Sequence, residues 1–177
     1  MRKFNKVIAT IITAIISISS MSCISASAYS TTITIDNDTN VSGYSNSYSG
    51  NWQYIRNSAS CYNRDARMVS SSSQGNCYFW EFNNYVGSDN GYTSCQLSVY
   101  LNHASFTDPK ASYNIETTVS QSSNVSVGVL NQNTAPGGWY VFDSKSFRGK
   151  IKEFNVYASG TSGKNTGADG IKAYITY

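Results

Sequence analysis

Two short alternating runs on either side of a turn constrain the fold of this chain more than any other feature. Val125, Val127 and Val129 alternate with small or polar residues, as a strand with one buried face requires. Residues 131–138 then supply Asn, Pro and Gly, which favour turns, before an aromatic and β-branched run over residues 139–142. The pattern predicts two strands joined by a loop.

Further segments have the same strand character and are separated by turn residues. They cover residues 31–35, 52–55, 65–70, 76–82, 94–102, 111–119, 150–157 and 171–175. We interpret residues 41–50, 83–93 and 159–170 as loops, because they are rich in Ser, Asn and Gly. No stretch beyond residue 28 shows sustained helical periodicity. The sequence therefore predicts an all-β chain, folded as a single antiparallel, jelly-roll-like β-sandwich.

The alternation also predicts which side chains form the core. We expect one core between two sheets that contains Tyr78, Trp80, Phe82, Leu97, Val99, Val127 and Val129. In the segment over residues 150–157, Ile151 and Phe154 are three positions apart, which breaks the alternation and indicates a β-bulge.

The first 28 residues have the layout of a secretory signal peptide. Basic residues come first, an apolar run follows over residues 7–18, and Ala26-Ser27-Ala28 offers a cleavage site. The apolar run is too short to span a membrane, which takes about 20 residues. Cys23 lacks the aliphatic residue that usually precedes a lipidated cysteine. We therefore expect cleavage after Ala28 and a secreted domain over residues 29–177, with no membrane contact afterwards.

The charge of this domain argues against nucleic acid as a partner. The whole chain has 13 Lys and Arg and 10 Asp and Glu, and the signal peptide contains three of the basic residues and none of the acidic ones. The domain therefore has ten basic and ten acidic residues and no formal net charge. Binding to nucleic acids or to anionic membranes requires clustered Lys and Arg. The local basic run at residues 145–152 is flanked by Asp143 and Glu153 and is read as a solvated strand edge.

Three cysteines remain in the domain, which permits at most one internal disulfide. Alternation turns Cys77 outward and Cys95 inward, so these two are poor partners. Cys61 with Cys77 is the better pair, and three free thiols are the alternative. The spacing does not fit a zinc site.

Short motifs along the chain, taken in order, resemble the golvesin C-terminal-like domain, also described as the xanthan-lyase carbohydrate-binding-like domain. The loop described above matches with Asn131-Gln132 followed by Gly137-Gly138-Trp139-Tyr140. The other matching pieces are residues 34–38, Gly50-Asn51-Trp52, residues 77–82 with 95–101, residues 111–115 and residues 168–171. The segments over residues 58–73 and 145–153 depart from the family pattern.

The resemblance implies a non-catalytic module that binds polysaccharide, because the family occurs attached to polysaccharide-active and other secreted enzymes. The partner would be a polysaccharide or a cell-surface glycan. Aromatic rings stack on the apolar faces of sugars, and Asn, Gln and Ser bond their hydroxyls. The candidate ligand-binding residues are the tyrosines that lie in polar segments: Tyr44, Tyr48, Tyr62, Tyr85 and Tyr92.

We find no residues that indicate catalysis. His103 has no oriented partner, and Glu81, Glu116 and Glu153 lie within predicted strands, where alternation turns them to solvent. No cofactor is expected, with structural calcium as the one candidate. Asp36 and Asp38 end the first strand, and Asp169 begins the last, so all three could meet a calcium ion or act only as turn residues.

Three functions therefore remain. The leading hypothesis is a secreted polysaccharide-binding module. The alternatives are an extracellular structural or adhesive protein with a protein partner, and a small secreted hydrolase. A linear array of exposed aromatic residues, a flat apolar patch, or a cleft with two close carboxylates would distinguish them.

Overall fold

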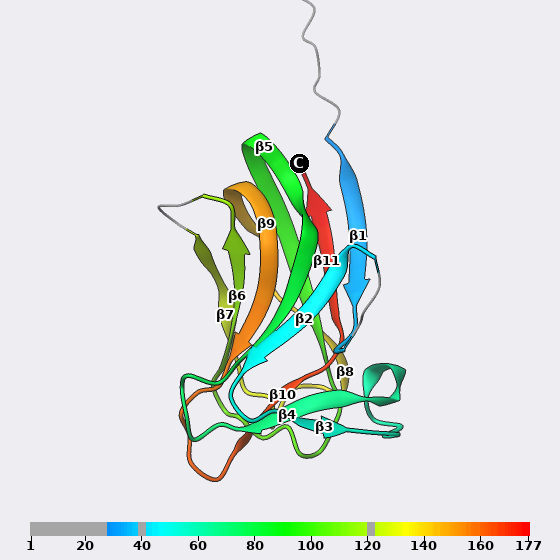
Figure 1. The fold of residues 1–177 in the computed structure, drawn as a ribbon, viewed down its shortest axis with the longest axis vertical. Helices are drawn as coiled ribbons and strands as arrows, with labels where there is room; N and C mark the ends of the chain where they lie inside the picture. Colours follow the sequence, from blue (N-terminus) through cyan, green and yellow to red (C-terminus); the bar gives the residue numbers. More distant parts are fainter. Residues whose placement is uncertain (1–27, 39–41, 120–122) are drawn as a thin grey trace, which may run out of the picture.

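A computed structural model describes residues 28–38, 42–119 and 123–177 (Figure 1). Almost all of the predicted signal peptide lies outside this range, and none of the described helical segments is long and apolar enough to cross a membrane. The strands are β1 (Ser30–Ile35), β2 (Tyr44–Ser49), β3 (Gln53–Ile55), β4 (Ala66–Ser70), β5 (Cys77–Leu101), β6 (Ala111–Thr117), β7 (Asn124–Leu130), β8 (Gly138–Val141), β9 (Lys145–Tyr157), β10 (Asn165–Ala168) and β11 (Ile171–Thr176), with one 3-10 turn, η1 (Tyr62–Arg64).

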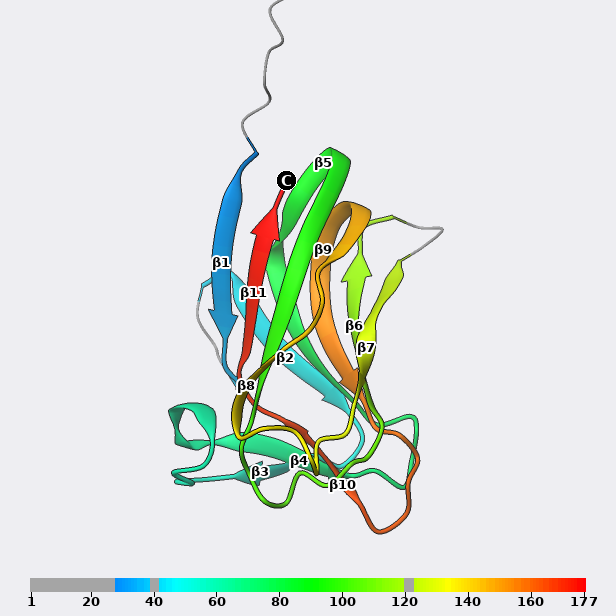
Figure 2. The ribbon, with the colours of Figure 1, turned by 180° about the vertical axis from the view of Figure 1, so that it is seen from behind.

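Eight strands form one hydrogen-bonded sheet that folds over into two layers (Figures 1 and 2). The second half of β5 pairs with β11 and β8, and β1 pairs with β11. The first half of β5 pairs with β2 and with the second half of β9, which in turn pairs with β6 and then β7. The prediction of an all-β, antiparallel sandwich is therefore confirmed.

The layers join where β5 and β9 bend together. At this corner Gly87 and Gly149 both have positive φ, 131° and 85°, which glycine adopts without strain. The buried Thr93 hydroxyl donates to the Gly149 carbonyl at 2.6 Å and accepts from the Ser88 amide at 2.9 Å. A Cβ on Gly87 would lie 2.5 Å from the Thr93 Oγ1 atom, so the corner requires glycine there.

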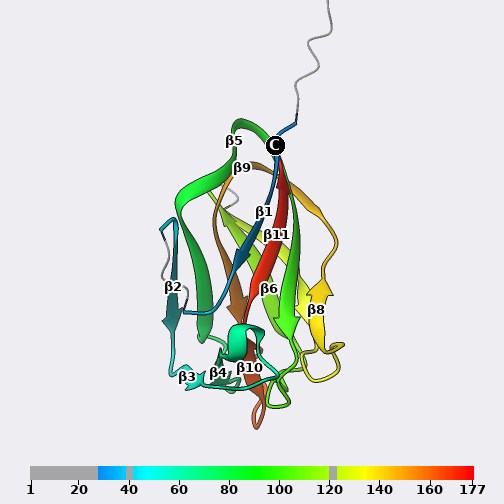
Figure 3. The ribbon, with the colours of Figure 1, turned by 90° about the vertical axis from the view of Figure 1, so that its right-hand side faces the viewer.

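At the opposite end, β3, β4 and β10 form a small separate sheet, with η1 beside it (Figure 3). Buried polar groups attach this sheet to the sandwich. The Asp108 carboxylate, fully buried, accepts from the Thr166 hydroxyl at 2.6 Å and the Ser159 amide at 3.0 Å. Each hydrogen bond to this carboxylate offsets the cost of burying its charge.

The core contains most of the predicted residues. Tyr78, Trp80, Phe82, Leu97, Val99 and Val127 are all at most 4% exposed. Their rings pack edge to face: the Tyr78 and Trp80 centroids are 5.0 Å apart, and those of Phe82 and Phe154 are 5.4 Å apart. Alternation along the first half of β5 therefore predicts its buried face correctly.

The prediction that Val129 is buried is wrong, because its side chain is 62% exposed. In the pairing of β6 with β7, Tyr113 faces Gly128 but Asn114 faces Ser126, so Val127 is an extra residue. This bulge changes the phase of β7, and Leu130 takes the buried position instead.

The bulge that the sequence predicts over residues 150–157 is present. In the pairing of β6 with β9, Glu116 faces Glu153 while Thr117 faces Ile151, so Lys152 is the extra residue. Ile151 and Phe154 can therefore both point into the core, and both are fully buried.

The three segments predicted as loops contain strands. β2 and β10 have few apolar residues, but backbone pairing with β5 and β4 makes them strands. Residues 83–93 lie inside β5, where turn residues serve the bend between the layers. The polar composition of these three segments reflects their exposure to solvent. Their secondary structure is determined by backbone hydrogen bonds to neighbouring strands.

All three cysteines in the described residues are free thiols and are buried. Cys77 lies opposite Tyr157 and points to the outer side of its strand, as predicted. Its side chain is nevertheless only 1% exposed, so pointing outward gives it no access to solvent. Burial raises the pKa of Cys77 and of Cys95 to about 12. Both are therefore protonated at neutral pH.

The fold predicts a large difference between two apolar truncations. Trp80→Ala should lower the free energy of unfolding by about 3 to 5 kcal/mol, because it removes a fully buried ring. Val129→Ala should change it by less than about 0.5 kcal/mol, since that side chain is exposed. Urea unfolding measures both. Equal effects of the two substitutions would show that the strand phases are assigned incorrectly.

Candidate functional site

One outer surface of the sandwich carries polar residues in matched register. It belongs to the layer of β2, the first half of β5, the second half of β9, β6 and β7. We call it the glutamate face. One row across the strands is Ser45, Glu81, Glu153, Glu116 and Asn124, and the next is Ser47, Phe79, Asn155, Asn114 and Ser126.

The sequence produces these rows by alternation. Glu81, Glu116 and Glu153 each neighbour an inward-facing residue, namely Phe82, Ile115 or Phe154, so their own side chains point outward. Cross-strand register then places them on adjacent strands, where facing Cβ atoms lie about 4.5–5.5 Å apart. Three carboxylates of one charge therefore lie in a single line.

Neighbouring donors hold the two outer carboxylates. The Ser45 hydroxyl donates to the Glu81 Oε2 atom at 3.0 Å, and the Ser47 hydroxyl donates to the Glu81 Oε1 atom. The ammonium group of Lys152, the bulged residue, lies 2.8 Å from the Glu116 Oε1 atom. These contacts reduce the repulsion along the row and fix the carboxylates in place.

The middle carboxylate is held by amides. The Asn155 Nδ2 atom donates to the Glu153 Oε1 atom at 3.2 Å, and the Asn114 Nδ2 atom donates to the Asn155 Oδ1 atom at 3.2 Å. Burial, with a further contribution from the charges of Glu116 and Glu81, raises the pKa of Glu153 above its usual value. The amide of Asn155 acts in the opposite direction.

A hollow of ≈ 320 Å³ opens at one end of the glutamate face. Its lining includes Glu81, Asn83, Tyr85, Lys152 and Glu153. The Tyr85 ring is 50% exposed beside charged and amide groups. Such a mixture can bond hydroxyl groups through its polar atoms and contact an apolar C–H face through its ring.

The five predicted ligand-binding tyrosines do not form one array. Tyr85 lines the hollow just described. Tyr48 is 46% exposed, and the Arg67 guanidinium lies 5.2 Å from its ring centroid. Tyr92, 63% exposed, lies near the corner, with the guanidinium of Arg148 5.3 Å from its ring centroid. A single short sugar chain on the glutamate face would therefore meet Tyr85 first.

The other two predicted tyrosines are packed against protein. The Tyr44 ring makes an edge contact with Phe82, with centroids 5.5 Å apart. The Tyr62 ring lies 5.1 Å from Trp139 in a T-shaped contact. Substitution of either ring would disturb packing as well as any ligand contact.

The predicted calcium ligands each bond to protein groups. Asp38 accepts from the Arg67 Nε atom at 2.9 Å and 3.1 Å, and Asp36 accepts from the Asn63 amide at 2.8 Å. Within the described ranges, no three His, Cys, Asp or Glu side chains are placed to hold a metal ion. Calcium binding by these acids therefore remains a prediction.

Asp169, the third predicted ligand, lies beneath η1. Its carboxylate accepts from the Tyr62 amide at 3.2 Å and from the Gly170 amide at 2.8 Å. Burial raises the pKa of Asp169 to about 8, although both amides act to lower it, and burial likewise raises the pKa of Asp36 to about 6.

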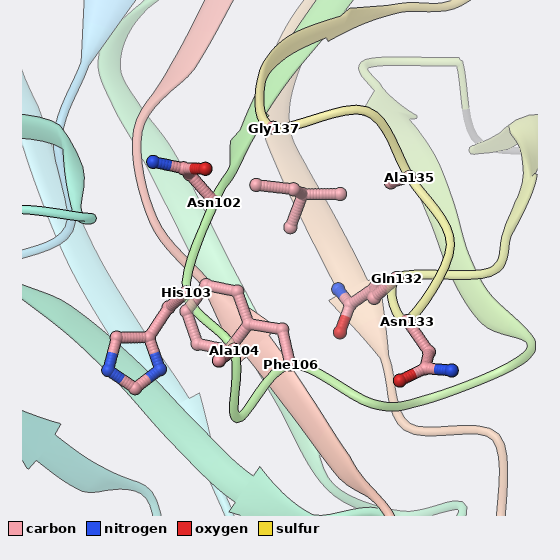
Figure 4. A pocket seen from close by; sticks show the side chains of 9 residues that line it. Asn102, His103, Ala104, Phe106, Gln132, Asn133, Ala135 and Gly137 are labelled. Carbon is pink, nitrogen blue, oxygen red and sulfur yellow. The ribbon is translucent and has the colours of Figure 1, made fainter.

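A second, smaller hollow lies between the β5–β6 loop and the β7–β8 loop (Figure 4). Gln132 in its wall has a structural role: its amide donates to the Tyr113 hydroxyl at 2.7 Å and to the Gly167 carbonyl at 2.9 Å. The His103 ring points away from the middle of the hollow in Figure 4, and its Nδ1 atom accepts from the Ser105 amide at 3.2 Å. Gln132, part of the motif that resembles the golvesin-type family, therefore links the β7–β8 loop to β6 and β10.

Comparison with known proteins identifies the fold. A Paenibacillus xanthan lyase structure matches 81% of this chain at 14% identity with a TM-score of 0.59, and the match spans 13% of that lyase. A family 35 carbohydrate-binding module from Cellvibrio japonicus matches at 10% identity, covering 81% of this chain and 92% of the module, with a TM-score of 0.49. A family 29 carbohydrate-binding module matches at 15% identity, covering 85% of this chain and 88% of the module, with a TM-score of 0.47.

No family model matches the chain, and no curated protein matches its sequence. The likeness to the xanthan lyase region, at 14% identity, shows a shared sandwich fold. Membership of the golvesin-type family remains a prediction from the motifs.

Several residues of the glutamate face were missed by sequence reasoning. The three glutamates were read as solvated strand positions, and Asn114, Asn155 and Lys152 were not singled out. The signal that they share a surface is the cross-strand register, which depends on both bulges and is not visible in any single strand.

The buried acids predict how stability depends on pH. The raised pKa values of Asp36 and Asp169 mean that the folded state binds more protons than the unfolded state between about pH 4 and pH 8. The contribution of these acids to stability is therefore greatest at low pH and falls as pH rises through that window. Between pH 5 and pH 8, the free energy of unfolding of Asp169→Asn should therefore fall less than that of the wild type, by about 1 kcal/mol or more.

Urea unfolding at both pH values measures the effect. Asp143→Asn, which removes an exposed carboxylate, is the control and should leave the slope unchanged. If the wild type and Asp169→Asn lose the same stability over this range, the carboxylate of Asp169 is not the group responsible.

A separate prediction concerns the effect of calcium on the melting temperature. If calcium binds through Asp36, Asp38 and Asp169, millimolar calcium should raise the melting temperature, since a ligand that binds only the folded state stabilises it. Asp38→Asn should reduce the rise. Melting curves that superpose in calcium and in chelator would leave the three acids as turn and capping residues.

Proposed function

We propose that this chain is a secreted, non-catalytic module that binds polysaccharide on the glutamate face. The observation that carries the proposal is the register of five strands, which places three carboxylates, serine hydroxyls and the Phe79 ring on one surface in two parallel rows. The amides of Asn155 and Asn114 are buried and support the middle carboxylate. A polysaccharide presents hydroxyl groups at regular intervals along its length. A surface of regularly spaced acceptors and donors suits such a ligand.

The face is already ordered before a ligand arrives. Ser45 and Ser47 fix Glu81, Lys152 fixes Glu116, and Asn155 fixes Glu153. Side chains held in this way lose little conformational freedom on binding, which favours affinity. The occurrence of the same fold within a xanthan lyase also supports a role at polysaccharides.

The hydrolase alternative has one observation in its favour. Glu153 lies between two carboxylates and has a raised pKa, as a general acid in a glycosidase would. Its neighbours Glu81 and Glu116 accept hydrogen bonds from Ser45, Ser47 and Lys152, which stabilise the charged carboxylates and make them weaker bases. Incubation with polysaccharides should therefore release no reducing ends. Release that Glu153→Gln abolishes would establish the hydrolase instead.

Binding to neutral polysaccharides tests the proposal directly. Tyr85→Ala should weaken binding by about 1 kcal/mol or more, because it removes the exposed ring in the hollow. Tyr174→Ala is the matched control, since Tyr174 is 49% exposed and belongs to β11 in the other layer. Salt should have little effect, since neutral hydrogen bonds and ring contacts are not screened.

Pull-down on insoluble glucans, xylans and mannans, followed by titration with soluble oligosaccharides, gives the measurement. Equal losses for Tyr85→Ala and Tyr174→Ala would place the contact surface elsewhere. A folded protein that binds no glycan across the panel but captures one protein from a cell-surface extract would favour the adhesive alternative.

A further inference from the structure

A third hollow is lined by residues of β3, of η1 and of the chain beside them. Figure 3 shows that these two elements lie together at one end of the domain. The hollow has a volume of ≈ 390 Å³, and we call it the arginine hollow. Its lining residues are Tyr54, Arg56, Asn57, Asn63, Arg64 and Asp65. The lining therefore combines two guanidinium groups, two amides, one phenol and one carboxylate.

Neither guanidinium in the hollow forms an ion pair with a described residue. The ion pairs within residues 28–38, 42–119 and 123–177 join Arg67 to Asp38, Lys150 to Asp89 and Lys152 to Glu116. Arg56 and Arg64 are both exposed and belong to none of these pairs. Two cations with free N–H donors therefore border one small volume.

A stack of alternating rings and cations holds Arg56 in position. The Arg67 guanidinium lies 5.2 Å from the Tyr48 ring centroid and 4.8 Å from that of Tyr54. The Arg56 guanidinium lies 5.0 Å from the centroid of the same Tyr54 ring. Asp38 anchors Arg67, so the stack is fixed at its inner end. A guanidinium stacked in this way keeps its N–H groups free for a ligand.

The backbone around the hollow is strained. Asn57, Asn63 and Arg64 have φ values of 55°, 45° and 76°, in the region that non-glycine residues rarely adopt. Asparagine tolerates this region, whereas arginine adopts it only at an energetic cost. Arg64 is the last residue of η1, so this conformation ends the turn and places Arg64 in the lining of the hollow.

The single carboxylate in the lining is already engaged. The Tyr54 hydroxyl donates to the Asp65 Oδ2 atom at 2.5 Å. A second carboxylate, that of Asp36, lies beside the lining and accepts from the Asn63 amide at 2.8 Å. The case for an anionic ligand therefore rests on the two guanidinium groups that form no ion pair, because guanidinium groups bind carboxylates through paired hydrogen bonds.

We propose that the arginine hollow binds the carboxylate of an acidic sugar residue, such as a uronate, within a polysaccharide. Arg56 and Arg64 would hold the carboxylate, and the exposed amide of Asn57 would reach a hydroxyl group beside it on the ring, since the Asn63 amide already donates to Asp36. The site is separate from the glutamate face, whose three carboxylates repel an acidic chain. The two surfaces therefore select ligands of different charge, and either can exist without the other.

The test uses oligogalacturonate and its fully methyl-esterified form, which has the same sugar chain but a neutral methyl ester in place of each carboxylate. The wild-type domain should bind the acid form at least tenfold more tightly than the ester. Affinity for the acid form should fall severalfold between 20 and 200 mM salt, unlike binding of neutral glycans at the glutamate face. Equal binding of acid and ester by the wild type overturns the proposal without any variant.

Variants then locate the site. Arg56→Gln combined with Arg64→Asn should reduce affinity for oligogalacturonate at least tenfold, and Asn is chosen because it tolerates positive φ. Arg148→Gln removes one exposed charge elsewhere and should have no effect. Arg56→Lys keeps the charge but not the planar fork and should lose part of the affinity.

Two further outcomes count against the proposal. Equal losses for Arg148→Gln and the double variant would mean that only net charge matters. Inorganic sulfate that displaces oligogalacturonate at equal concentration would mean that the hollow binds any small anion and reads no sugar. Tyr85→Ala should leave oligogalacturonate binding unchanged, and so distinguishes failure here from failure at the glutamate face.

Discussion

The hydrogen bond from the buried Thr93 hydroxyl to the Gly149 carbonyl lies at the one place where both long strands change layer. β5 and β9 run through both layers as a single antiparallel pair, and every other strand of the large sheet attaches, directly or through a neighbour, to one half of it. Gly87 and Gly149 allow the backbones to approach closely at the bend. The separation of the two layers, and so the space for the core, depends on this corner.

The corner also determines which surfaces the domain presents. Because the second half of β9 continues from the bend with a fixed register, Glu153 meets Glu81 on one side and Glu116 on the other. The bulge at Lys152 then brings an ammonium group to the end of that row. A different register at the bend would place core residues outside and the carboxylates inside, so surface chemistry and folding are specified together.

Much of the fold could be predicted because alternation is a local property. Trp80 and its neighbours were placed correctly from a seven-residue stretch, and the bulge in β9 was visible from the spacing of Ile151 and Phe154. Val129 was misplaced because its bulge arises from pairing with β6, which leaves no mark in β7 itself. The glutamate face likewise arises from pairing between strands. Its residues were known to point outward, but their alignment is a property of five strands together.

The buried thiols of Cys77 and Cys95 set a limit on how long the domain survives in an oxidising environment. While folded, their high pKa and lack of access protect them from oxidants and from one another. An unfolded chain has neither protection, and a mixed disulfide formed in that state would not fit the packed interior. In an oxidising environment, each excursion to the unfolded state would risk a covalent trap, and the unfolding rate would then limit the lifetime more than the equilibrium stability does.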